Sequence, residues 1–408
     1  MQKLSATKDE GSQVLRQMLL CEKAGVLRGA SITNGGLVRS YLEPENYKEA
    51  PPYNQADETL PECLWKPSVA LDPRHRPQIW GEPSTTVRRE WCRYPQEAHL
   101  LDEPRGRYRR LTVDEMAIIQ GFPTDWFDVP SLSTRNRIRA IGDAVPPPLA
   151  RAVINGVASV WDWKNLTAIE ICAGAGGLAS GANYIAGMKH VLVLDQWPPA
   201  CEILRHRCTV KVSDAEARPI KAWPVESVRC QDVHEYDFSP YKRGIGLLSG
   251  GPPCQPWSQG GLRAGSTDSR DLLGYIHELV SLIEPEVFVF ENVPGLACEQ
   301  NTGYFEKVLD SLRNCAKPHW KYGVVAGILN AADFGVPQIR HRLFIIGFRD
   351  QPCSLAYRAF DRIAANATHR DPTKPHQSRK PWITLAESLG SRPDPGGWRG
   401  WITKSAGL

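Results

Sequence analysis

The sequence predicts an α/β fold in which helices cover both faces of a mostly parallel sheet. Between residues 166 and 347, short apolar runs alternate with longer amphipathic stretches. The runs are nearly continuous in Val, Ile, Leu and Phe, which is typical of strands buried on both faces. We expect strands at residues 167–171, 191–194, 246–248, 287–290 and 343–346, and covering helices at residues 272–283 and 305–312.

Residues 109–161, which precede this block, also have a helical pattern. Thr112 and Glu115 form a capping box at the start of a helix that should end near Gly121. Three prolines at 146–148 precede another apolar stretch, and proline is favoured in the first turn of a helix. We therefore expect at least two helices before the first strand.

Length and composition describe a globular chain with more than one lobe. Its 408 residues are too many for one compact core, and its 42% hydrophobic and 23% charged residues exclude a wholly disordered protein. No apolar run approaches the roughly 18 residues of a membrane span, and the polar start does not resemble a signal peptide. Eleven cysteines without a Cys-x-x-Cys pair disfavour a disulfide framework or a structural zinc. We expect a cytoplasmic protein with reduced thiols, no metal and no membrane association.

Residues 1–105 and 351–408 differ from the centre of the chain in composition and in hydrophobic periodicity. They are rich in Pro, Arg, Trp and Gly and show weak periodicity. The second segment holds nine Lys and Arg against four acidic residues, an excess larger than the net charge of +4 of the whole chain. Such clusters are often only solvated surface. Arg interleaved with Trp and Gly at 396–401 also suits a nucleic-acid surface built from loops.

A glycine-rich turn follows the first predicted strand. Residues 172–177 read Cys-Ala-Gly-Ala-Gly-Gly, and Asp195 ends the next predicted strand. Glycines let the backbone approach a ligand closely, and a carboxylate at a strand end can bind the ribose hydroxyls of a nucleoside. Taken alone, the turn is equally consistent with a structural tight turn.

Cys254 lies in a stiff proline-flanked loop directly after the predicted strand 246–248. A lone cysteine is most often a small buried hydrophobe, which is our interpretation of the other ten. Cys254, however, is poorly placed for core packing and well placed to present its thiol to a cleft. Glu291 follows strand 287–290 and should lie at the same edge, because parallel strands deliver their following loops to one side.

Arg340 and Arg342 precede the last predicted strand. Residues two apart on an extended chain point the same way, so both guanidinium groups could reach one anionic or carbonyl-bearing ligand. The alternative is a pair of surface residues in ion pairs.

In this order and at these strand ends, the glycine turn, Pro-Cys-Gln, Glu-Asn-Val and Gln-x-Arg-x-Arg resemble the cytosine carbon-5 DNA methyltransferase family. Residues 110–123 and 141–146 are similar to the last two motifs of that family. Here they precede the first motif, so the chain resembles a circularly permuted member. The resemblance covers roughly residues 108–350.

The resemblance implies covalent catalysis on a cytosine in DNA. Cys254 matches the nucleophile, whose addition at carbon 6 makes carbon 5 enamine-like. Glu291 matches the residue that binds ring nitrogen 3 and the exocyclic amine. Arg342, with Arg340 nearby, matches the position that contacts the cytosine carbonyl oxygen. The target base must be flipped out of the duplex.

The resemblance also implies S-adenosylmethionine as the methyl donor. Asp195 matches the acid that binds the ribose, and Asp232 matches the acid near the adenine amine. Cys172 stands where an aromatic residue is common in the family, and Asp143 replaces the usual Asn. The implied cofactor contacts are Cys172, Gly174, Gly176, Asp195, Gln196, Asp232, Pro253, Asp143, Ala144 and Val145.

The implied fold is a Rossmann-like, mostly parallel methyltransferase sheet with a smaller, irregular target-recognition lobe. We expect residues 1–107 and 351–408 to form the two parts of that lobe. Residues 108–161 should carry the permuted motifs, and residues 162–350 the S-adenosylmethionine-binding catalytic domain. Double-stranded DNA is the expected partner, and a monomer is expected because flipping one base needs no second copy. A cognate restriction endonuclease would fit a modification enzyme without direct contact.

Three other functions are open at this point. A transfer-RNA cytosine-5 methyltransferase would carry the same motifs, but a recognition region assembled from both termini favours duplex DNA. A non-catalytic DNA-binding relative is disfavoured by the intact Cys254, Glu291 and arginines. A nicotinamide oxidoreductase fits the glycine turn but gives the Pro-Cys-Gln loop no role.

Overall fold

The structure, a computed structural model, places one large sheet at the centre of the chain. It describes residues 31–33, 36–39, 78–92, 98–102, 107–183, 185–209, 223–253, 272–298, 301–315, 321–373, 378–392 and 402–403.

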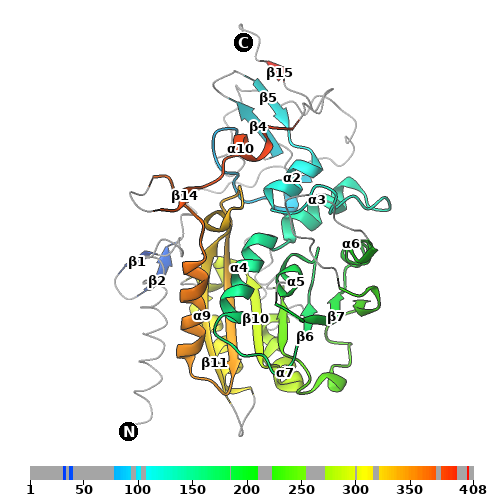
Figure 1. Cartoon of the computed structure of the whole chain (residues 1–408), viewed down its shortest axis with the longest axis vertical. Helices are drawn as coiled ribbons and strands as arrows, with labels where there is room; N and C mark the ends of the chain where they lie inside the picture. The colour runs from blue at the N-terminus through cyan, green and yellow to red at the C-terminus, as the bar shows by residue number, and fades with distance from the viewer. Residues whose placement is uncertain are drawn as a thin grey trace.

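The central sheet has seven strands in the order β11-β12-β10-β9-β6-β7-β8 (Figure 1). The five strands from β10 to β8 run parallel, whereas β12 is antiparallel to both of its neighbours, β10 and β11. This confirms the predicted mostly parallel α/β fold. The strands are β6 (Thr167–Ile171), β7 (Lys189–Asp195), β8 (Val228–Cys230), β9 (Leu247–Gly250), β10 (Val287–Asn292), β11 (Tyr322–Asn330) and β12 (His341–Arg349).

All five predicted strands are present, but β8 and β11 were not predicted. Every residue of β11 is buried, yet two glycines interrupt its apolar run. They are needed where α9 (Cys353–Ala365) and the segment before it press on the strand: a Cβ at Gly327 would lie 2.7 Å from the ring of Phe360. A Cβ at Gly323 would lie 2.5 Å from the carbonyl oxygen of Gln351. Because close packing requires glycine at these two positions, β11 lacks the continuous run of Val, Ile and Leu that predicts a buried strand.

Helices cover the sheet on both faces. The helices α4, α5 and α9 pack together over one face (Figure 1). Helix α8 packs against both α7 and β11. Because every residue of β10 and β11 is buried, neither face of these strands meets solvent. The remaining bounds are α4 (Pro147–Ala158), α5 (Gly177–Ala182), α6 (Pro198–Thr209), α7 (Leu272–Ile283) and α8 (Thr302–Asn314).

The helices predicted before the sheet are confirmed. Helix α2 (Val113–Ile119) begins at the predicted capping box, in which Thr112 and Glu115 exchange side-chain and backbone hydrogen bonds. The carboxylate of Glu115 also pairs with Arg109 at 2.6 Å, and both side chains are almost fully buried. Helix α3 (Thr134–Asp143) follows, and α4 begins on the predicted prolines.

One element differs from the expectation of weak periodicity after residue 350. Residues 353–365 form α9, whose buried residues Leu355, Ala359 and Ile363 recur at helical spacing, and the helix packs against α4, β11 and β12. The average composition of the basic C-terminal segment conceals this short amphipathic helix. The lobe boundary at residue 350 stays a prediction. Helix α9 follows this boundary but packs against elements that precede it.

Three strands within residues 78–110 and one strand of residues 402–403 form a second, four-stranded sheet of order β15-β5-β4-β3. Residues 402–403 (β15) pair with β5 (Arg107–Arg110), and backbone N–H groups of Leu385 and Ala386 donate to Glu82 and Trp80. The other elements are β3 (Gln78–Ile79), β4 (His99–Asp102), η3 (Arg89–Cys92), β13 (His369–Arg370), β14 (Lys380–Pro381), α10 (Leu385–Leu389), β1 (Ser31–Thr33) and β2 (Gly36–Arg39). Among the described residues, none of the helices has the length and apolarity that crossing a bilayer requires.

Gly177→Ala tests the close approach between the glycine turn and the chain before α4. A Cβ at Gly177 would lie 1.9 Å from the carbonyl oxygen of Val145, so backbone must move. We expect a loss of about 1–3 kcal/mol in the free energy of unfolding, measured in urea. Gly303→Ala is the matched control, because Gly303 also lies in the first turn of a helix and a Cβ there meets nothing within 4 Å. Equal effects of the two substitutions would contradict the packing.

Candidate functional site

The predicted site residues that the structure describes gather at one edge of the sheet. Cys172 follows β6, Asp195 ends β7, residues 251–253 follow β9, and Glu291 lies near the end of β10. The strand β12 runs the other way, so its first residues meet the last residues of β10. Leu343 therefore pairs with Asn292, and Arg342 reaches this edge although its strand is antiparallel.

Cys254 lies outside the described residues, but the chain that leads to it is anchored at this edge. A Cβ on Gly251 would lie 3.2 Å from Oε2 of Glu291 and 4.0 Å from the carbonyl oxygen of Cys172. The side-chain amide of Asn292 donates to the carbonyl oxygen of Pro252 at 3.0 Å. The loop that carries the cysteine thus begins between the glycine turn and the end of β10. The anchoring role of Asn292, the middle residue of Glu-Asn-Val, was not predicted from the sequence.

Glu291 and Arg342 form a buried ion pair. Nε of Arg342 lies 2.8 Å from Oε1 of Glu291, and the two side chains are only 12% and 11% exposed. Burial raises the pKa of Glu291, against the opposing charges of Arg342 and Arg340. The pair can present a carboxyl group and guanidinium N–H groups side by side. That combination is complementary to a heterocycle with an amine, a ring nitrogen and a carbonyl.

Arg340 lies apart from this pair, in contrast to the expectation that both guanidinium groups could reach one ligand. Its side chain is 0% exposed. Nη1 donates to the carbonyl oxygen of Val87 at 2.8 Å, and Nη2 donates to those of Gly142 and Ala144 at 2.7 and 3.1 Å. Arg340 therefore joins three chain segments that are distant in sequence.

Gln338, the first residue of Gln-x-Arg-x-Arg, extends the same network. Its Nε2 donates to Oε1 of Gln120 at 2.7 Å, and its Oε1 accepts from the backbone N–H of Val87 at 2.9 Å. Backbone hydrogen bonds pair Ser84 with Pro337 and Ile339 alongside it. No role for Gln338 was predicted from the sequence. Its position among the apolar residues Val336, Pro337 and Ile339 indicates burial, and a buried amide side chain needs internal hydrogen bonds.

The glycine turn is shaped by backbone conformations that favour glycine. Gly174 and Gly176 have φ values of 55° and 81°, and Cys172 has a φ of 49°. The N–H of Gly174 donates to Oδ2 of Asp195 at 2.8 Å, and the N–H of Trp197 donates to Oδ1 at 2.8 Å. Burial raises the pKa of Asp195, and these two N–H groups oppose that shift. Asp195 thus holds the turn in place.

Residues 143–145 lie against the glycine turn. The carbonyl oxygen of Val145 approaches Gly177 as described above, and that of Ala144 accepts from the side-chain amide of Gln120. Asp143 is exposed, with its carboxylate 3.7 Å from Nη1 of Arg89 and 3.8 Å from Nε of Arg139. The structure therefore brings this predicted cofactor segment to the predicted turn.

The remaining predicted cofactor residues follow three strands of the sheet: Gln196 follows β7, Asp232 follows β8 and Pro253 follows β9. Gln196 is exposed and Pro253 is half-buried. The ring of Trp197 lies under the guanidinium group of Arg139, with 4.4 Å from Cζ to the ring centroid. The carboxylate of Asp232 accepts from the backbone N–H of His234, which lowers the pKa of Asp232.

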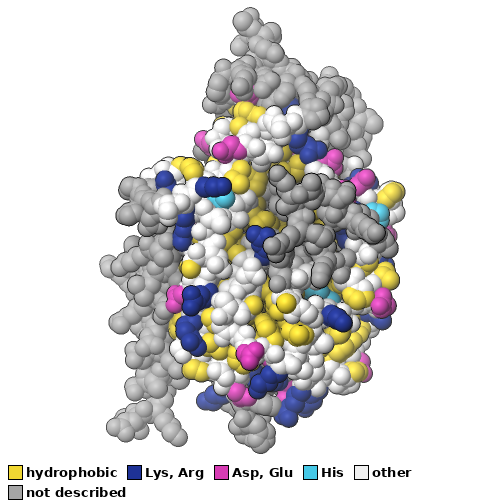
Figure 2. All heavy atoms as spheres, viewed as in Figure 1, with side chains coloured by type: hydrophobic (Ala, Val, Ile, Leu, Met, Phe, Trp, Pro, Cys, Tyr) yellow, Lys and Arg dark blue, Asp and Glu magenta, His cyan; other side chains and the backbone are white. Residues whose placement is uncertain are grey.

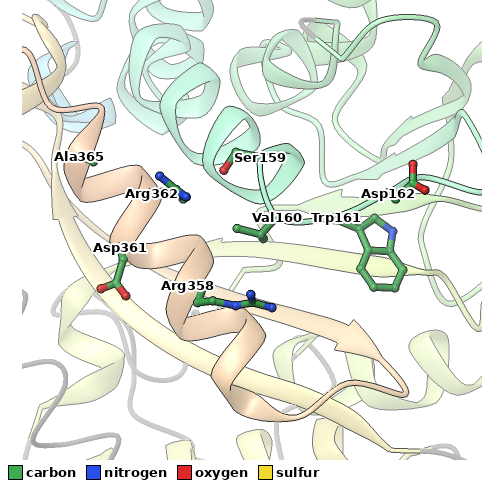
Figure 3. A pocket seen from close by; sticks show the side chains of 8 residues that line it. All are labelled: Ser159, Val160, Trp161, Asp162, Arg358, Asp361, Arg362 and Ala365. Carbon is green, nitrogen blue, oxygen red and sulfur yellow. The ribbon is translucent and has the colours of Figure 1, made fainter.

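A cavity of about 650 Å³ lies elsewhere, between the end of α4 and α9. Arg362 of α9 lies near Ser159 there, and the side chain of Arg358 extends toward Val160 and Trp161 (Figure 3). None of the predicted site residues that the structure describes lines the cavity. On the face drawn in Figure 2, basic side chains are scattered over uncharged surface and do not form one continuous patch.

The fold and this edge define an α/β protein with a glycine turn, a strand-end acid and a buried Glu–Arg pair. A model of the family described as C-5 cytosine-specific DNA methylase matches residues 46–159 and 166–381, which is most of the chain. The chain belongs to this family.

Curated relatives are Type II methyltransferases. M.NaeI of Lentzea aerocolonigenes is 33% identical over 191 residues, which are 46% of this chain and 41% of the relative. M.NgoMIV of Neisseria gonorrhoeae is 32% identical over 187 residues, 45% of this chain and 52% of the relative. The chain thus spans about half the length of these curated relatives. Among solved structures, the methyltransferase EhMeth of Entamoeba histolytica is 19% identical over 45% of this chain and 53% of that chain, with a TM-score of 0.34.

Arg340→Met tests the buried network. It leaves the buried carbonyl oxygens of Val87 and Gly142 without this donor and that of Ala144 with only Gln120, so we expect the free energy of unfolding in urea to fall by about 3 kcal/mol or more. Arg137→Met is the control: Arg137 donates to one carbonyl oxygen, that of Val129, and its side chain is 24% exposed. For the control we expect a loss of about 1 kcal/mol or less. A similarly small loss for Arg340→Met would show that its hydrogen bonds contribute little.

Proposed function

We propose that this protein transfers a methyl group from S-adenosylmethionine to carbon 5 of cytosine in double-stranded DNA. The observation that carries the proposal is the Glu291–Arg342 pair beside Gly251, three residues before Cys254. Family membership and the Type II methyltransferase relatives support the same reaction.

Cytosine needs activation because its carbon 5 is a poor nucleophile. The thiolate of Cys254 adds to carbon 6, which forms a carbon–sulfur bond and leaves an enamine at carbon 5. A free cysteine has a pKa of about 8.5, so the loop must favour the thiolate or remove the proton during attack. After methylation, loss of the carbon-5 proton and breakage of the carbon–sulfur bond release the thiolate and the methylated base.

Glu291 and Arg342 are the residues proposed to hold the ring. The raised pKa of Glu291 suits a carboxyl group that shares a proton with ring nitrogen 3 while its other oxygen accepts from the exocyclic amine. Arg342 donates to the carbonyl oxygen of the base. Arg340 acts differently: through Gly142 and Ala144 it positions the segment beside the glycine turn.

The residues around the glycine turn fit S-adenosylmethionine, which supplies the methyl group when bound. Each carboxylate oxygen of Asp195 accepts one backbone N–H and keeps a further lone pair for a ribose hydroxyl. A Cβ on Gly174 would meet nothing within 4 Å, so the space above this turn is open to a ligand. Asp232, Gln196, Pro253 and residues 143–145 complete the proposed pocket, and Cys172 and Gly176 shape its turn.

The motif order supports a circular permutation. Helix α4 leads into β6 through residues 159–166 and packs against α5, so the permuted motifs lie beside the first motif without a long connection. The four-stranded sheet joins residues 402–403 to residues 78–110, which supports a target-recognition lobe drawn from residues 1–107 and 351–408. Within the second segment, α9 packs on the central sheet and so belongs with the catalytic part. That lobe would contact the phosphates and the bases of the duplex around a flipped cytosine.

Cys254→Ala tests the nucleophile. We expect transfer of labelled methyl groups from S-adenosylmethionine to plasmid DNA to fall below detection, because no covalent adduct can form. DNA binding in a gel-shift assay and cofactor binding by calorimetry should remain measurable. Cys353→Ala, on α9 away from this edge, should retain activity. Methylation by the folded Cys254→Ala variant would refute the assignment.

The substrate is tested with the unmodified protein. Methyl incorporation into plasmid DNA is expected, with total transfer RNA as the competing substrate. Bisulfite sequencing of the plasmid should then show modified cytosines in one recurring sequence context. Incorporation into transfer RNA alone would contradict the DNA assignment, and absence of any incorporation would favour a non-catalytic relative.

Asp195→Asn tests the cofactor site. An amide can accept from only one of the two N–H groups that Asp195 binds and would turn its NH₂ toward the other. We expect the affinity for S-adenosylmethionine, measured by calorimetry, to fall about ten-fold or more, which corresponds to about 1.4 kcal/mol or one charged hydrogen bond. Asp310→Asn, on the exposed face of α8, is the control. Unchanged affinity in folded Asp195→Asn would place the cofactor elsewhere.

A further inference from the structure

Glu170 is a buried acidic residue in the middle of the sheet, with a side chain 1% exposed. Its Oε2 accepts a hydrogen bond from the hydroxyl of Ser249 in β9, and its carboxyl group also accepts from the backbone N–H of Ala179 in α5. Strand β9 leads into the cysteine loop, and α5 follows the glycine turn. The side chain of Glu170 therefore links the elements that carry the two halves of the proposed site.

The strand register places Glu170 on the same face as Glu291. Glu170 pairs with Ser249 across β6 and β9, and Ser249 pairs with Val289 across β9 and β10. Glu291 is two residues beyond Val289, so its side chain leaves the same face, one step closer to the site edge. The two carboxyl groups interact electrostatically, and the charge of Glu291 disfavours ionisation of Glu170.

Among the described residues, no positively charged group is a main influence on the charge of Glu170. From β10 it faces Glu291, whose partner is Arg342, and Cys172 in the turn after β6 is also coupled to it. Asp195 leaves the same face of β7, and α5 has no charged residue. Burial is the main cause that raises the pKa of Glu170 to about 8, and the bond from Ser249 only partly opposes it. Glu170 accordingly carries a proton at neutral pH.

We propose that Glu170 is a positioning residue for the methyl transfer: its carboxyl group ties β9, which leads into the cysteine loop, to α5, which follows the glycine turn, and it lies behind Glu291 on the same face of the sheet. The inference rests on the proposed function. Ionisation of Glu170 would place a second negative charge behind Glu291 and oppose the electron density that thiolate addition puts on the ring. The reaction should therefore slow when Glu170 loses its proton.

The first test measures protonation without any activity. Between about pH 4.5 and 8 the folded chain holds a proton on Glu170 that the unfolded chain has released, so stability falls as pH rises through this window. We expect the unfolding constant of the unmodified protein, relative to that of Glu170→Gln, to rise about ten-fold per pH unit there and to level off above pH 8. A ratio independent of pH would overturn the proposal.

The second test measures methyl transfer to plasmid DNA at several pH values. Glu170→Gln has the size of the native residue and no charge, so its rate at pH 7 should stay within about three-fold of the unmodified rate. The ratio of the variant's rate to the native rate should rise about ten-fold between pH 7 and pH 9, because only the native residue ionises. The ratio cancels the contribution of the Cys254 thiol, which both proteins share. A constant ratio would overturn the positioning role.

Ser249→Ala provides an independent arm if Glu170→Gln folds poorly. Removing the hydroxyl that stabilises the charged form should move the alkaline loss of activity to higher pH than in the unmodified protein. An unmoved or lowered midpoint would contradict the proposal. Failure of the unmodified protein to methylate DNA at any pH would instead refute the proposed function, and the unfolding measurements would still report the proton on Glu170.

Discussion

The antiparallel direction of β12 is the constraint on which the site depends. In a wholly parallel sheet the start of this strand would lie at the opposite edge from the end of β10. Because β12 is reversed, Glu291 near the end of one strand and Arg342 near the start of the next become neighbours. Close packing maintains the pairing: the ring of Phe288 lies so near Gly347 that a Cβ there would come within 2.1 Å of it. The Glu–Arg pair thus follows from the direction of the two strands.

A buried polar network joins segments that precede β6 to this sheet. Gln338 and Arg340 bind backbone groups of Val87, Ile119, Gly142 and Ala144, which come from segments far apart in sequence. Such groups cost free energy when they are buried without partners, so the network specifies one arrangement of these segments more strictly than apolar packing would. The segment that lines the glycine turn is held in place in this way, although no strand of the central sheet passes through it.

The sequence predicted the fold well where local patterns and packing agree. Continuous apolar runs identified five of the strands, and the Thr112–Glu115 capping box identified the start of α2. The same pattern did not predict β11, because Gly323 and Gly327 interrupt its apolar run to leave room for residues 351–352 and Phe360. It also missed α9, because a short amphipathic helix contributes little to the composition of a long basic segment.

At the site, the pattern predicted which residues gather but not how they divide their roles. Regular alternation predicts that Arg340 and Arg342 point the same way, yet β12 begins only at His341. Arg340 lies in the irregular chain before it, so its guanidinium group enters the interior while that of Arg342 meets Glu291. The partner of each arginine depends on where the strand begins, and a motif of five residues does not contain that information.

Burial also influences the ionisation of the acidic side chains at and behind this edge of the sheet. Two acidic residues, Asp195 and Glu291, lie where a polyanionic duplex is proposed to approach, and a third, Glu170, is buried behind Glu291. Free carboxylates at these positions would repel the duplex. Each is moderated in a different way: burial raises the pKa of Glu170, two backbone N–H groups bind Asp195, and Arg342 pairs with Glu291. The edge can therefore present acidic groups to a base and a nucleoside while its net field stays small. Recognition of phosphates then falls to basic residues outside this edge, which is consistent with the excess of Lys and Arg in residues 351–408.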